Sequence, residues 1–155
     1  MSRLHRVVYV SRWSNGLGED AEAALHRIVA VSIGNNRTSD ITGLLVAHEG
    51  WFLQAVEGPQ ASVAALVARI IRDPRHRSVR VLSEGPAEAR LFQDWDMAGA
   101  RLSPEAEPLL VELGQIARFD GYGLDGEAAL QLLVFAAEAR RRRELANLGP
   151  NRAAG

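Results

Sequence analysis

Gln54 stands out chemically, because it is an amide within a strand-like run of apolar residues. The run 51–58 follows the turn-like sequence His48-Glu49-Gly50 and ends at a glycine-proline pair. Side chains alternate along a strand, so Gln54 shares a face with Phe52 and Val56. An inward-facing amide without hydrogen-bond partners would cost about 1–3 kcal/mol. We therefore expect a polar partner opposite Gln54, from the protein, water or a ligand.

Four further polar residues occupy inward positions on separate predicted elements. Tyr9 lies in a strand, while Ser32 and Asn35 end the buried stripe of a helix and Asn36 follows where that helix should stop. Each has a purely structural explanation, and Asn35 and Asn36 could simply cap the helix end. Together with Gln54, they suggest a planar ligand rich in donors and acceptors, lodged between two helices.

The elements that must position these residues form a recognisable order. The predicted elements are a strand over 7–11, a helix over 19–35, strands over 41–47 and 51–58, a helix over 60–72, a strand over 79–83 and a fifth strand that follows 92–97. This β-α-β-β-α-β order with an additional strand predicts a ferredoxin-like α+β sandwich, with two helices on one sheet face. Near-continuous apolar strands indicate a sheet covered on both faces. Strand alternation would place Trp95 and Met97 on one face, where hydrophobic filling is their default role.

The C-terminal third is predicted to be helical and could cover the other sheet face. One apolar stripe runs through Leu109, Leu113 and Ile116, and a second helix begins after Asp125, a plausible N-cap. The run of four arginines over 140–143 is typical of a solvated helix end. We expect a ligand-binding domain over 1–102, a helical extension over 103–147 that packs on the sheet or in an oligomer interface, and a flexible tail over 148–155.

Composition excludes several function classes. The chain has 155 residues, a formal net charge of −1 and no cysteine. This charge gives no footprint for direct binding of nucleic acid or an anionic membrane, and no N-terminal segment is long or apolar enough for a signal peptide. Four scattered histidines lack metal-ligand spacing, and no P-loop or other common catalytic motif occurs. We expect a cytoplasmic protein without a metal.

An ordered series of short motifs extends along the first two-thirds of the chain. The series comprises Val8-Tyr9-Val10-Ser11, Asn35-Asn36, Ile41-Thr42-Gly43-Leu44-Leu45, Phe52-Leu53-Gln54, Glu57-Gly58, Arg69-Ile70, Asp73-Pro74-Arg75-His76 and Trp95-Asp96-Met97. In order and spacing it resembles the BLUF family of blue-light sensors that bind FAD. The resemblance runs from about Leu4 to Arg101. Beyond Ser103 only the general plan of short family members, a helical extension without a fused effector, is similar.

The resemblance implies roles for individual residues. Tyr9 would be the electron and proton donor, and Gln54 would bridge it to the flavin. Asn36 would hold the pyrimidine edge of the flavin, and either Trp95 or Met97 would pack near Gln54 and transmit its change. The full cofactor-binding set implied is Tyr9, Ser32, Asn35, Asn36, Phe52, Gln54, Arg69, Asp73 and His76. For the pair Arg69 and Asp73, four apart on a helix, an ordinary surface ion pair is the alternative.

The implied function is a light sensor, not an enzyme, that signals to a separate downstream protein. Two alternatives stay open, namely a flavin-dependent oxidoreductase and a flavin-free interaction module. A ferredoxin-like acyl phosphatase is disfavoured, because no glycine-rich phosphate cradle is present. The family resemblance also implies a homo-oligomer, at least a dimer.

Overall fold

A computed structural model describes residues 4–13, 39–72, 76–116 and 118–148, without the side chains of Trp13, His76 and Arg77. The elements in chain order are β1 (Leu4–Trp13), β2 (Thr42–His48), β3 (Trp51–Pro59), α2 (Gln60–Arg72), β4 (His76–Pro86), β5 (Ala98–Arg101), the 3₁₀ turn η2 (Pro104–Ala106), α3 (Glu107–Glu112), the 3₁₀ turn η3 (Gly121–Gly123) and α4 (Gly126–Asn147). The helix predicted over 19–35 lies outside the described residues.

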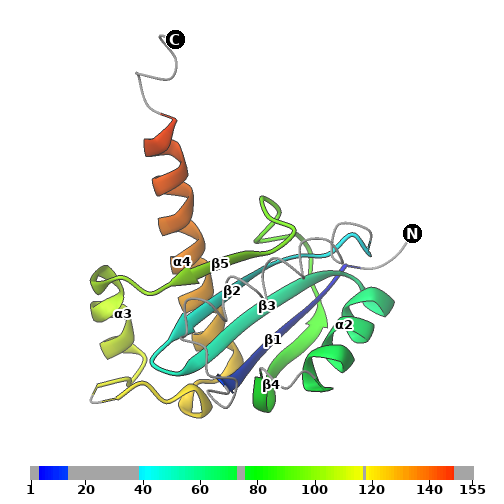
Figure 1. Ribbon diagram of the computed structural model, residues 1–155, viewed down its shortest axis with the longest axis horizontal. Coiled ribbons are helices and arrows are strands. Elements are labelled where there is room, and N and C mark those ends of the chain that lie inside the picture. The colour runs from blue at the N-terminus through cyan, green and yellow to red at the C-terminus, as the bar shows by residue number, and fades with distance from the viewer. Residues whose placement is uncertain (1–3, 14–38, 73–75, 117, 149–155) are drawn as a thin grey trace.

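The five strands form one sheet in the order β4-β1-β3-β2-β5 (Figure 1). Neighbouring strands are antiparallel except β2 and β5, which are parallel. The first four strands have the order expected of a ferredoxin-like α+β fold, and β5 is the predicted additional strand. The fold class predicted from the sequence is therefore confirmed.

The β2–β3 hairpin sets the register of the central strands. His48 pairs with Trp51 across a two-residue turn, and φ is positive at both Glu49 and Gly50. Such angles are those of the tight turn whose twist matches a hairpin. Consequently, residues 51–57 of β3 have defined partners on β2, and Gln54 lies opposite Leu45.

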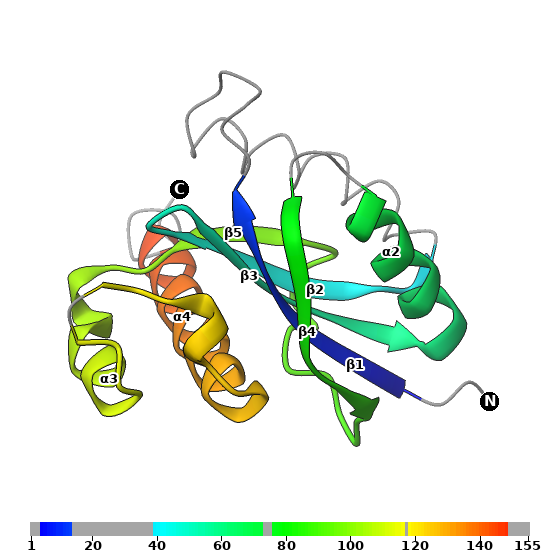
Figure 2. The same ribbon diagram turned by 90° about the horizontal axis from the view of Figure 1, so that it is seen from below.

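Helices cover both faces of the sheet (Figure 2). On one face, Val63, Leu66 and Ile70 of α2 pack with alternate residues of β1 and β3. On the other, buried residues of α4 such as Leu132 and Leu133 pack on the intervening residues. The C-terminal helix thus covers the sheet face opposite α2.

Capping and glycine residues set the start of α4 and the end of α3. The Asp125 carboxylate accepts a hydrogen bond from the Ala128 amide at 2.8 Å, so the predicted N-cap of α4 is confirmed. The predicted stripe through Ile116 is wrong, because α3 ends at Glu112 and Gly114 takes a φ of +83°. Ile116 then lies beyond the helix and is 76% exposed.

Candidate flavin site

Tyr9 and Gln54 are directly opposite each other on the central strands β1 and β3. Directly opposite residues of an antiparallel pair project to the same face, with Cβ atoms about 4.5–5.5 Å apart. Tyr9 is 0% exposed and Gln54 is 1% exposed, on the face that α2 covers. The fold therefore brings a phenol and an amide together in a core otherwise built from aliphatic and aromatic side chains.

The hydrogen bonds of the Gln54 amide are incomplete. Nε2 donates to the sulfur of Met97 at 3.3 Å, and a thioether is a weak acceptor. Oε1 is buried and accepts no hydrogen bond from any residue that the structure describes. Leaving a buried carbonyl without a hydrogen bond lowers the stability of the folded protein by about 1–3 kcal/mol. The arrangement fits a planar group such as a flavin, whose edge carries both donors and acceptors.

Gly43 on β2 makes room for Met97. A Cβ at this position would lie 3.0 Å from Met97 Cε and would overlap the Ala55 carbonyl oxygen. The Gly43 amide also donates to the Trp95 carbonyl at 3.2 Å. Because only glycine fits here, the segment that carries Trp95 and Met97 can lie close against the sheet. The sequence motif contained Gly43, but its role follows only from the structure.

Trp95 and Met97 lie on opposite faces of the sheet, so the prediction that they share one is wrong. Met97 joins the Tyr9 side of the core, whereas Trp95 packs on the α4 side. Trp95 Nε1 donates to the Glu144 carboxylate at 3.1 Å. Strand alternation fails here because β5 begins only at Ala98. Met97 is thus the residue next to Gln54.

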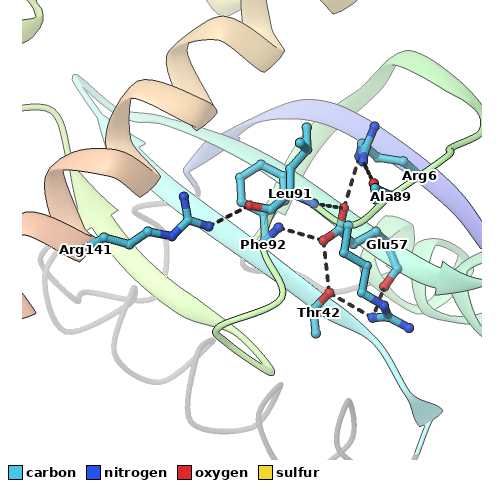
Figure 3. A network of polar contacts seen from close by, with 8 residues as sticks. Arg6, Thr42, Glu57, Ala89, Leu91, Phe92 and Arg141 are labelled. Carbon is cyan, nitrogen blue, oxygen red and sulfur yellow. Dashed lines mark hydrogen bonds and ion pairs between the residues drawn. The ribbon is translucent and has the colours of Figure 1, made fainter.

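A buried carboxylate, Glu57, fixes the start of the connection from β4 to β5 (Figure 3). Its oxygens accept from Arg6 Nε, from the Thr42 hydroxyl and from the amides of Leu91 and Phe92, at 2.7–3.1 Å. A fully buried charge is tolerated when it is paired and hydrogen-bonded in this way. Glu57 belongs to the sequence motif series, but its structural role was not predicted, although its place on the same strand face as Leu53 and Ala55 was a signal.

Two arginines of α4 hold the same connection from the other side. Arg141 donates to the Leu91 carbonyl at 2.7 Å and pairs with Asp94, and its guanidinium lies 5.0 Å from the centre of the Trp95 ring. Arg140 donates to the Gly99 carbonyl of β5 at 2.8 Å. The prediction of a solvated arginine run therefore fails for these two residues, which anchor residues 91–99 to α4.

The structure describes only some of the other predicted site residues. Ser32, Asn35, Asn36 and Asp73 lie outside the described residues, as does the side chain of His76, whose backbone begins β4. Phe52 is fully buried on the Gln54 face, and Arg69 is exposed in the last turn of α2.

None of the described helices is long and apolar enough to cross a membrane. Across the part of the chain that the structure describes, no cluster of histidine or carboxylate ligands could hold a metal ion.

The fold and the buried phenol–amide pair match one family. The model of the BLUF family, described as sensors of blue light using FAD, matches residues 4–98. The chain therefore belongs to the BLUF family. It carries a blue-light-sensing flavin domain, and its cofactor is FAD.

Relatives of known sequence contain this domain within longer proteins. The beta subunit of photoactivated adenylate cyclase from Euglena gracilis is 31% identical over 101 residues, which are 65% of this chain and 12% of that protein. The alpha subunit is 29% identical over 119 residues, or 75% of this chain and 11% of the subunit. The chain thus spans about an eighth of these relatives, and the match concerns a sensor domain.

Solved structures include proteins of similar size. A dark-state structure of the BLUF protein BlrB is 28% identical with a TM-score of 0.70, covering 90% of this chain and 98% of that one. The photo-activated state of BlsA has a TM-score of 0.79 at 24% identity over 86% of this chain and 94% of that one, which supports the fold alone. A bacterial light-regulated adenylyl cyclase is 31% identical with a TM-score of 0.65, over 73% of this chain and 34% of the cyclase.

Proposed function

We propose that blue light drives electron and proton transfer between Tyr9, Gln54 and bound FAD, and that the rearranged hydrogen bonds are signalled to a separate protein. The observation that carries the proposal is the half-satisfied Gln54 amide. It lies opposite Tyr9, donates to the Met97 sulfur, and has an Oε1 that accepts no hydrogen bond from the described residues. The proposed role is that of a sensor without catalytic activity of its own.

Tyr9 has the chemistry required of the donor. When bound, FAD absorbs blue light and its excited ring is a strong oxidant. A phenol in a dry core can give up its hydroxyl proton as it gives up an electron, and both can return afterwards. Within the described residues, the neighbours of Tyr9 in this core are aliphatic and aromatic side chains together with Gln54 and Met97, so water would be largely excluded. No net oxidation of the chain results.

Gln54 is suited to store the change because an amide both donates and accepts. In the present orientation, Nε2 points at Met97. If the amide turns over, the carbonyl oxygen Oε1, which accepts rather than donates, would face the sulfur. A thioether has no proton to offer, so the contact would be lost. Met97 would thus report the state of Gln54.

Residues 91–97 offer a physical route for this change to α4. Met97 contacts Gln54, and Trp95, two residues away, is bonded to Glu144 of α4. We therefore propose that residues 1–102 bind the flavin and that residues 103–147 carry the output. The tail expected over 148–155 lies, apart from Leu148, outside the described residues. The downstream protein would recognise this output.

The remaining assignments rest on the family resemblance. Asn36, supported by Asn35 and Ser32, would hold the pyrimidine edge of the flavin, and Phe52 would line the ring site. By the same resemblance, Arg69, Asp73 and His76 would lie near the ring, the ribityl chain or the phosphates. We further propose that the protein acts in the cytoplasm and as a homo-oligomer of at least two copies.

Absorption spectra test the proposal directly. The purified protein should be yellow, shift its flavin absorbance to the red under blue light and recover in darkness. Tyr9→Phe removes only the phenolic oxygen, so it should retain the flavin and lose the shift. A normal shift in Tyr9→Phe would refute this mechanism. Steady turnover of a reductant in the dark would instead indicate a flavin oxidoreductase, and a chain that binds no added FAD a flavin-free interaction module.

A further inference from the structure

Guanidinium groups and aromatic rings alternate at one end of the sheet, on the face that α4 covers. Arg12 of β1 lies directly opposite Trp51 of β3, and its guanidinium is 4.4 Å from the centre of the Trp51 ring. The Tyr122 ring of η3 meets the Trp51 ring edge to face, with their centres 4.7 Å apart. The guanidinium of Arg80, on β4, lies 4.2 Å from the centre of the Tyr122 ring. These interactions join β1, β3, β4 and η3 at this end of the sheet.

The fold holds both aromatic rings in place. The segment between α3 and α4 passes the C-terminal end of β1 (Figure 1), and η3 contacts that strand. Gly121 permits the close approach, because a Cβ there would overlap Val10 and Trp51. The Tyr122 hydroxyl donates to the Ser78 carbonyl of β4 at 2.8 Å. The two arginines therefore rest on rings whose positions are fixed by the backbone around them.

A hollow of about 270 Å³ opens beside these rings. It is lined by Arg12, Glu49, Trp51, Arg118 and Phe119. Trp51 and Phe119 are almost fully buried, whereas Arg12 and Arg118 are exposed. The hollow therefore combines aromatic walls with guanidinium groups, and these residue types are enriched among the hot spots of protein interfaces.

The carboxylates near the hollow are engaged by backbone amides. Glu49 accepts from the Phe119 amide at 2.9 Å, and Asp120 accepts from the Tyr122 amide at 3.0 Å. Three exposed arginines, which we call the arginine cluster, surround this region: Arg12, Arg80 and Arg118. None of the ion pairs between described residues includes the cluster. Like charges gathered on one surface raise the local positive potential, which a bound anion would lower.

We propose that this surface binds an acidic segment of a partner protein, whose carboxylates pair with the arginine cluster and whose side chain enters the hollow. A guanidinium binds a carboxylate through two parallel hydrogen bonds. Because Arg12 and Arg80 already lie against rings, they lose less conformational entropy when a carboxylate binds. A nucleic acid suits the surface less well, since Glu49 and Asp120 would meet its phosphates and the chain has a net charge of −1.

Fluorescence polarisation with the full chain in the dark tests this surface. The probe is a fluorescein-labelled peptide of alternating glutamate and tyrosine, which the wild type should bind less tightly as salt is raised. Arg80→Gln and Arg118→Gln should each weaken binding about tenfold, because each removes charge-assisted hydrogen bonds. Arg143→Gln makes the same charge change at an exposed position of α4 and should bind like the wild type. A wild type that binds no peptide, or equal losses in all three variants, would overturn the inference.

Charge reversal and a second probe test the chemistry of the partner. Arg80→Glu combined with Arg118→Glu should lose the acidic peptide and bind a peptide with lysine in place of glutamate. Failure of this exchange would contradict direct pairing with the cluster. Single-stranded oligouridylate is the other probe, and tighter binding of this RNA than of the peptide would overturn the choice of a protein partner. Thermal unfolding checks that each variant is folded. Because no photochemical step is involved, a missing red shift would leave this test intact.

Discussion

The Gln54 amide and the Met97 sulfur are joined by a hydrogen bond of 3.3 Å inside a core that also holds Tyr9. A sulfur atom can accept from Nε2 but offers nothing to Oε1. The pair is therefore sensitive to which end of the amide faces it. This sensitivity gives the flavin domain a way to convert a rotated side chain into movement of the segment that precedes β5.

Gln54→Leu is the most direct test of this arrangement. Leucine fills similar space without polar atoms. It also removes a buried carbonyl that accepts no hydrogen bond from the described residues. We expect the fold and bound flavin to be retained and the red shift to be abolished. Stability to urea should change by less than about 1.5 kcal/mol. A red shift that survives in Gln54→Leu would show that the amide is not the switch.

Glu57→Gln tests the anchor of the 91–97 segment. The neutral amide of glutamine cannot form an ion pair with Arg6. Its NH₂ group would also face the Thr42 hydroxyl and the backbone amides of Leu91 and Phe92, which are themselves donors. Because buried donors are left unsatisfied, we expect a loss of about 3 kcal/mol in the free energy of unfolding, measured in urea. Glu84→Gln, an exposed carboxylate of β4, is the matched control and should change stability by less than about 0.5 kcal/mol. Equal effects of the two substitutions would contradict a structural role for Glu57.

Much of the fold was predictable because it depends on local patterns. The strand order follows from the sequence of elements, and α2 has the bounds that its apolar spacing predicts, Gln60–Arg72. The hairpin and the Asp125 N-cap were recognisable from turn and capping residues. The pairing of Tyr9 with Gln54 needed the register of β1 and β3, which no local pattern reveals.

The features that sequence reasoning missed depend on distant contacts. Glu57 is held by backbone amides more than thirty residues away, at Leu91 and Phe92. Trp95 and Met97 separate because their segment is not a strand, and alternation holds only within strands. Arg140 and Arg141 belong to a sequence run typical of a solvated helix end, but they donate to backbone carbonyls of Gly99 and Leu91, which are distant in sequence.

His48 should give the protein a modest loss of stability in mild acid. Burial, opposed by Glu49 and reinforced by Arg101, lowers the pKa of this imidazole below its ordinary value. A lowered folded-state pKa means that the unfolded chain binds the proton more readily, so stability falls as the pH drops below about 6.5. In His48→Asn, the difference in unfolding free energy between pH 7.5 and pH 5.5 should be smaller than in the wild type. An identical pH dependence in both proteins would argue against this contribution.

Met97→Leu tests whether the change at Gln54 reaches α4. Leucine conserves volume, at a cost below about 1.5 kcal/mol, but it cannot accept a hydrogen bond from Nε2. We expect the red shift to form under blue light, because Tyr9 and Gln54 are intact. In the wild type, light should loosen the contacts of Trp95 with Glu144 and Arg141, and amide exchange over residues 141–147 should accelerate about tenfold, equivalent to about 1.4 kcal/mol.

In Met97→Leu this acceleration should be absent, because the sulfur that links the amide to the 95–97 segment is gone. Leu66→Met, a volume-conserving change in the same core, keeps Met97 and should show both the red shift and the faster exchange. Hydrogen–deuterium exchange of dark and lit samples measures the difference. If α4 still responds to light in Met97→Leu, the signal leaves the flavin domain by another route. If the red shift itself is lost, Met97 participates in the photochemistry rather than in its transmission.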